Sequence, residues 1–188
     1  VAVTGVQTCA LPIFCDGTID VIATDHAPHS IEEKTRQDIW TVDCGFPGVE
    51  TQMPLMLTAV AKGRGSICDY VRWSAANPAK IWGLYPRKGV IQPGADADIA
   101  VVDLNRRWTI VDTELHSTAK ISPWNGWEVQ GMPLHTIVRG RFVVKNRVLQ
   151  SGTKGWGQSV HKIQNMPTPS PVNLDQTTAA ILSSGARI

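Results

Sequence analysis

The feature that most constrains the fold is the segment at residues 19–30, IDVIATDHAPHS, in which an apolar run leads directly into an acid and two histidines. The nearly continuous apolar run predicts a strand that is covered on both faces, as in a parallel α/β sheet. Asp25 stands where the run stops, and the Ala-Pro pair after it would hold an extended or turned backbone, with His29 near the mouth of a site. The alternative, which spacing alone leaves open, is that Asp25 and Ser30 only cap a turn.

Helical spacing begins after residue 50. Four apolar side chains recur at i, i+3, i+4 and i+7, which predicts the core-facing side of a helix rather than a partner-binding face. These side chains are Met53, Met56, Leu57 and Val60. Ser66 can cap a second helix, and Asn77-Pro78 predicts the start of a third helix, whose Ile81, Trp82 and Leu84 would pack inward.

Downstream of these helices the pattern changes to strands and turns. Residues 98–103 predict one strand. Residues 136–144 and 147–149 predict two more strands, joined by a turn at Lys145-Asn146 because Asn tolerates positive φ. The two aspartates within residues 93–98 are a weak calcium signal, since no glutamate completes a calcium loop, and we interpret the segment as a turn that enters the first strand.

Several segments, in order along the chain, resemble the end of the dihydroorotase branch of the amidohydrolase superfamily, and hydantoinases and allantoinases share most of them. They are ATDHAPH at 23–29, GFPGVET at 45–51, NPAKIWGLYPRKG at 77–89, PGADADI at 93–99, SPWNGW at 122–127 and TIVRG at 136–140. Ordered matches across roughly residues 17 to 150 are more specific than any single motif.

The resemblance implies an α/β fold, namely the carboxy-terminal fragment of a metal-dependent (β/α)8 TIM barrel plus part of a small β-sandwich domain. On this division, residues 15–86 end the barrel with its last strand and following helices, residues 87–150 form part of the β-sandwich, and residues 151–188 form an extended carboxy-terminal tail. A whole barrel of this type takes about 250 residues. Residues 1–14 are expected to be a non-native leader, because residues 3–13 resemble translated sequencing-adaptor read-through.

The resemblance also implies roles for individual residues. In the family, the Asp that ends the eighth barrel strand binds a metal and serves as general acid/base, and Asp25 matches that catalytic and metal-binding position. His29 matches a residue that helps to hold the carboxylate of a dihydroorotate-like substrate. Cys44 and Gly45 match a substrate-binding loop whose backbone contacts the pyrimidine ring, although related sequences often have Pro or another small residue at Cys44. His26 is expected to orient Asp25 or to pack locally.

The implied cofactor is Zn2+, as one or two divalent metals. The family's other metal ligands come from earlier strands, and nothing before Ile19 matches them. A catalytic zinc takes about three protein ligands, so a lone Asp cannot hold it. We therefore expect this chain to be inactive in isolation and its longer parent to be the enzyme.

The expected substrate is a small cyclic amide. Dihydroorotase activity, which converts dihydroorotate to N-carbamoyl-aspartate in pyrimidine biosynthesis, is favoured because hydantoinases lack the Ala-Pro-His arrangement at the strand end. A hydantoinase/dihydropyrimidinase or an allantoinase is the alternative. A non-catalytic amidohydrolase-like interaction protein is the alternative from another class.

Composition agrees with part of an ordinary soluble enzyme. The formal net charge of +2, with 43% hydrophobic and 18% charged residues, gives no reason to expect nucleic acid or membrane partners. No apolar stretch approaches the ~20 residues of a membrane span. The four Cys show no paired spacing, which favours a reduced, cytoplasmic setting. We expect the parent to be a homo-oligomer.

Overall fold

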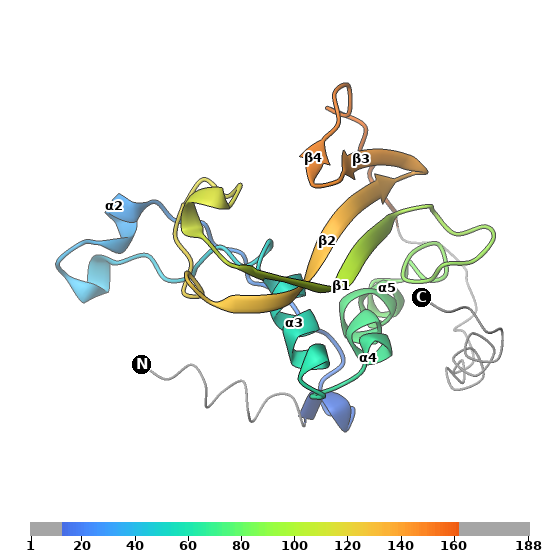
Figure 1. Ribbon diagram of the computed structural model, residues 1–188, viewed down its shortest axis with the longest axis horizontal. Coiled ribbons are helices and arrows are strands. Elements are labelled where there is room, and N and C mark those ends of the chain that lie inside the picture. The colour runs from blue at the N-terminus through green and yellow to red at the C-terminus, as the bar shows by residue number, and fades with distance from the viewer. Residues whose placement is uncertain (1–12, 162–188) are drawn as a thin grey trace.

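Four antiparallel strands form one side of the structure, and they are neighbours in the sheet in the order in which they occur along the chain (Figure 1). This computed structural model describes residues 13–161. The strands are β1 (Ile99–Thr109), β2 (Glu128–Val138), β3 (Arg141–Lys145) and β4 (Val148–Leu149). Most of the predicted leader, and the predicted tail from residue 162 onward, lie outside the described residues. No helix within the described range has the length and apolar character that a membrane crossing requires.

Two tight turns connect the last three strands. Arg139 and Gly140 join β2 to β3 with φ of 49° and 77°, and Asn146 and Arg147 join β3 to β4 with φ of 50° and 65°. Two successive residues with positive φ match the twist of the flanking strands, which is why such hairpins are favoured. The turn predicted at Lys145-Asn146 is therefore confirmed, but it lies one residue further along, at Asn146-Arg147. The prediction of one strand over residues 136–144 is wrong, because the Arg139-Gly140 turn divides it.

The helix α3 packs against β2, other short helices pack on α3 and on one another, and α2 lies on an arm that extends away from them (Figure 1). The arm contains α2 (Ile31–Lys34) and η1 (Ile39–Thr41), and the packed helices are α3 (Gln52–Ala61), α4 (Ile67–Val71), η2 (Arg72–Ala76) and α5 (Asn77–Ile81). A further short turn, η3 (Asp112–Glu114), follows β1. The helix predicted after residue 50 is confirmed, and Ser66 caps α4 as predicted, with its side chain accepting a hydrogen bond from Asp69 N.

Two expectations for α5 are wrong. Asn77 has helical φ and ψ and does not cap a new helix, because α4 continues through η2 into α5. Its side-chain amide instead donates to the carbonyl oxygen of Asp20 at 2.9 Å. Ile81 and Trp82 are 62% and 72% exposed, since no other described segment covers that face.

The main packing contact joins α3 to β2. A Cβ at Gly131 would lie 2.6 Å from the Leu57 Cβ, so the backbone of β2 approaches the helix as closely as a glycine allows. Beside this contact, Thr58 Oγ1 donates to Pro54 O at 2.7 Å and accepts from Gln130 N at 2.8 Å. An apolar contact and a polar contact therefore fix the helix to the sheet.

The strand predicted at residues 19–23 does not form. A buried strand needs a hydrogen-bonded neighbour on its edge, and no described strand lies beside this segment. The segment is extended and rests on the helices, with Ile22 N donating to Trp73 O at 3.2 Å. Its Val21 and Ile22 are only half-buried.

The two aspartates that resembled calcium ligands form ion pairs instead. Asp96 accepts a hydrogen bond from Arg87 Nε at 2.9 Å, and Asp98 pairs with Lys88 and Arg139. Burial opposes ionisation of Asp96, but the hydrogen bond from Arg87 and the charges of Arg139, Arg87 and Lys88 outweigh it and lower the pKa of the carboxyl. These contacts tie the turn before β1 to the β2–β3 turn.

Candidate active site

Two segments that are distant in sequence lie side by side at the predicted site. We call residues 24–29 the Asp25 segment and residues 43–49 the Gly45 loop. A parallel bridge pairs His26 with Phe46, and Ala27 N donates to Phe46 O at 3.1 Å. The structure therefore brings together the two motifs from which the site residues were predicted.

Glycine makes this close approach possible. Gly45 has φ of 104°, and a Cβ there would lie 2.5 Å from the Ala27 Cβ. A Cβ at Gly48 would lie 3.0 Å from Thr24 O. The 2.5 Å approach at positive φ requires glycine at position 45, and the tight 3.0 Å approach favours glycine at position 48.

Asp25 has an unusual backbone conformation. Its φ is 44°, in the left-handed region, and the residue is exposed. A non-glycine residue held there costs of order 1–3 kcal/mol and persists only when its surroundings determine it. Here both neighbours are held, because Thr24 packs on Gly48 and His26 is bonded to the Gly45 loop. The fold thus presents one exposed carboxylate on a strained but fixed backbone.

His29 lies beside two acids that the sequence analysis did not connect with it. One ligand atom from each of His29, Glu33 and Asp43 lies within 4.8 Å of the others, and His29 Nδ1 is 3.8 Å from Glu33 Oε2. The i, i+4 spacing of His29 and Glu33 at the start of a helical turn was the available sequence signal. The position of Asp43 depends on the Gly45 loop, so no local pattern indicates it.

These acids also have partners of their own. The backbone N–H of Ser30, with its side chain and the charges of His29 and Arg36, lowers the pKa of the Glu33 carboxyl. Asp43 pairs with Arg36 at 3.3 Å. The group offers nitrogen and oxygen atoms that can bind a cation, but Arg36 would compete for the same carboxylate.

Asp25 does not belong to this group, and no other group of three or more such ligands occurs within the described range. The residues present therefore do not complete a zinc site at Asp25, which supplies one carboxylate. Cys44 is exposed and unpaired at the start of the Gly45 loop. It directly follows Asp43, which belongs to the group formed with His29 and Glu33.

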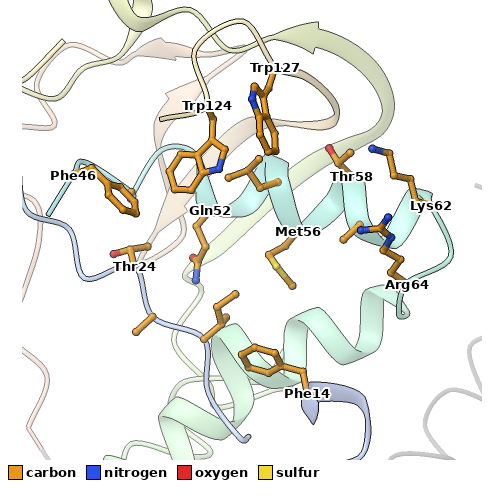
Figure 2. Close-up of a pocket in the computed structure, with 15 residues that line it drawn as sticks. Phe14, Thr24, Phe46, Gln52, Met56, Thr58, Lys62, Arg64, Trp124 and Trp127 are labelled. Atoms are coloured by element: carbon orange, nitrogen blue, oxygen red, sulfur yellow. The ribbon is translucent and has the colours of Figure 1, made fainter. Parts of the chain in front are cut away.

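An apolar cavity of about 350 Å³ lies behind the Asp25 segment, between that segment, α3 and the loop before β2 (Figure 2). None of the four predicted site residues lines it. Figure 2 shows Phe46 and Trp124 together on its wall, and their rings meet edge to face with centroids 5.0 Å apart. Phe46 and Gly48 of the Gly45 loop therefore line the cavity, and Asp25 does not.

Comparison with known proteins identifies the family. Residues 3–143 match the family model described as "Amidohydrolase family". This chain belongs to the amidohydrolase family. The resemblance to the dihydroorotase and hydantoinase group is also confirmed by individual relatives.

The amidohydrolase chain is 44% identical over 141 residues to a dihydroorotase of Methanothermobacter thermautotrophicus. This alignment covers 75% of this chain and 32% of that protein. It is 40% identical over 149 residues to an L-hydantoinase of Paenarthrobacter aurescens, which covers 77% of this chain and 32% of the relative. The solved structure of a D-hydantoinase (dihydropyrimidinase) from Thermus sp. matches with a TM-score of 0.77 and 34% identity, over 81% of this chain and 34% of that one. The chain thus spans about a third of the length of these relatives.

Proposed function

We propose that this chain is the carboxy-terminal part of a metal-dependent cyclic amidohydrolase, with dihydroorotase as its activity. The observation that carries the proposal is the exposed Asp25 carboxylate, held at φ of 44° against the Gly45 loop and followed by His29. The similarity to a dihydroorotase over 75% of the chain supports it. In this proposal residues 15–86 end a TIM barrel, and residues 87–150 form part of a β-sandwich.

The reaction is the hydrolysis of a ring amide. Water adds to the amide carbon, the carbon–nitrogen bond breaks, and one proton of the water ends on the leaving nitrogen. Asp25 would accept that proton at a carboxylate oxygen and then deliver it to the nitrogen. A bound zinc ion would supply Lewis-acid chemistry, with Asp25 as one of its ligands. Its other ligands would come from outside the described residues, and we therefore propose that this chain alone is inactive.

Substrate recognition would depend on the residues next to Asp25. The atom of His29 nearest to Glu33 is Nδ1, which leaves Nε2 to donate to a substrate carboxylate. Backbone groups at Cys44 and Gly45 would contact the ring of the substrate, because the close approach to Ala27 fixes that stretch of backbone. The whole enzyme is proposed to be a cytoplasmic homo-oligomer.

A hydantoinase, dihydropyrimidinase or allantoinase activity is the second candidate. The L-hydantoinase relative and the D-hydantoinase structure favour it nearly as strongly as the dihydroorotase relative favours the first. The two candidates differ in the need for a carboxylate contact at His29. A non-catalytic interaction protein is disfavoured, because it would have no use for a strained acid at this position.

The test compares Asp25→Asn with His29→Ala in the full-length protein. Asn tolerates positive φ, so Asp25→Asn keeps the backbone while removing the proton acceptor, and we expect kcat to fall by at least about 10²-fold. His29→Ala should raise KM for dihydroorotate about tenfold or more, through loss of a charge-assisted hydrogen bond. A hydantoin without a carboxylate is the matched control, and its KM should change little. Equal and mild effects of both substitutions would contradict these assignments.

A further inference from the structure

One histidine of the motif has no role in the proposed chemistry but makes well-defined hydrogen bonds. His26 Nδ1 accepts from Gly48 N at 3.1 Å and from Val49 N at 3.3 Å. Both partners are backbone N–H groups and can only donate, so Nδ1 must present its lone pair. His26 therefore acts as a hydrogen-bond acceptor toward the loop.

These bonds hold the end of the Gly45 loop. At its centre the loop is already fixed to the Asp25 segment, through the bridge of His26 to Phe46 and the contact of Gly45 with Ala27. Beyond Val49 the chain leads into α3 through its N-cap residue Thr51, which is 1% exposed. Without the ring nitrogen, two consecutive N–H groups at the junction of loop and helix would lose their acceptor.

We propose that His26 is a positioning residue that holds the backbone of the Gly45 loop where it contacts the substrate. The side chain acts through hydrogen bonds to the loop and does not touch the reacting atoms. The consequence for catalysis rests on the function proposed above, whereas the two hydrogen bonds do not.

The experiment uses three variants of the full-length protein. His26→Asn places an amide oxygen near the position of Nδ1 and can accept both hydrogen bonds, while His26→Phe keeps a ring of similar size but offers no acceptor. His135→Phe is the matched control, because His135 Nδ1 also accepts one backbone N–H, from Asn146 at 3.0 Å, in the hairpin between β3 and β4. Hydrogen exchange by mass spectrometry would follow peptides that cover residues 44–51 and 141–149, and steady-state kinetics would use dihydroorotate and a hydantoin.

We expect His26→Phe to speed exchange at residues 48 and 49 at least about tenfold and to raise KM for the hydrolysed substrate about tenfold, with kcat within about threefold. His26→Asn should restore both values to within about threefold of the unaltered protein. His135→Phe should speed exchange only in the 141–149 peptides and leave KM unchanged.

The two parts of the inference can fail separately. Unchanged exchange at residues 48 and 49 in His26→Phe would overturn it, as would equal effects of Phe and Asn. Faster exchange with an unchanged KM would overturn the positioning role. If the unaltered protein hydrolyses no cyclic amide while the exchange pattern is as expected, the proposed function fails and the hydrogen-bonding role is supported.

Discussion

Two backbone conformations, at Asp25 and Gly45, determine the geometry of the candidate site at the scale of single residues. Asp25 has φ of 44° and Gly45 has φ of 104°, and the two lie on segments that are bonded to each other. Neither value is common for a residue with a Cβ, but a short polar side chain such as Asp accepts it more easily than most. The site therefore needs glycine at one position and tolerates an acid at the other.

Gly45→Ala tests this packing directly. The added Cβ would meet Ala27 at 2.5 Å at a positive φ, whereas Gly94→Ala, at φ of 90°, would meet nothing within 4 Å. Both variants carry the cost of a left-handed alanine, about 1–2 kcal/mol. We expect Gly45→Ala to lower the free energy of unfolding of the full-length protein by a further ~1–3 kcal/mol, measured by urea denaturation, because of the steric overlap. Equal losses in the two variants would show that the Ala27 contact is unimportant.

Sequence reasoning reached part of this site. Resemblance to a family indicated Asp25, His29 and the Gly45 loop, and the structure places the Asp25 segment against that loop. The partners of His26 and the position of Asp43 beside His29 could not be read from the sequence. Both depend on a contact between segments about twenty residues apart, and no local periodicity encodes that contact.

At the scale of helices and strands, the contact of α3 with β2 is the main packing contact. Leu57 lies on Gly131, and Thr58 bonds to Gln130 beside it. The helix was predictable because its apolar stripe repeats with the helical period. The position at which the helix packs on β2 could not be predicted, because a glycine such as Gly131 ordinarily weakens a strand and does not indicate a helix contact.

Thr58→Val isolates the polar half of this contact. Valine keeps the shape but leaves Gln130 N, which donates to Thr58 Oγ1 at 2.8 Å, without its acceptor. Thr35→Val is the matched control. Thr35 Oγ1 donates to Ile31 O at 2.9 Å, as Thr58 Oγ1 donates to Pro54 O, but it has no hydrogen bond to a strand. We expect Thr58→Val to reduce the free energy of unfolding by about 1–3 kcal/mol and Thr35→Val by much less. Equal thermal shifts in calorimetry would contradict the proposed docking role.

Strands were harder to predict than helices. Residues 19–23 have the composition of a buried strand, but a strand also needs a neighbour to accept its hydrogen bonds. No described segment supplies one, so the run is extended without a sheet. The β2–β3 turn was missed because Arg139 is not a residue type that signals positive φ.

At the scale of the whole molecule, large apolar side chains lie on the surface. Ile39, Trp40, Trp82 and Ile91 are between 72% and 92% exposed. Exposed apolar side chains of this size lower the solubility of a chain. We therefore expect poor solubility of the isolated chain. These side chains also agree with a chain that spans about a third of the length of its relatives.

Hydrolysis of dihydroorotate by the purified full-length protein, with hydantoin and allantoin as competing substrates and a chelator as control, tests the central claim most directly. We expect turnover of dihydroorotate with the highest kcat/KM of the three, its loss on chelation and its recovery when zinc is returned. We also expect no turnover by the 188-residue chain alone. Turnover that survives chelation, or chelator-sensitive turnover by the isolated chain, would contradict the claim.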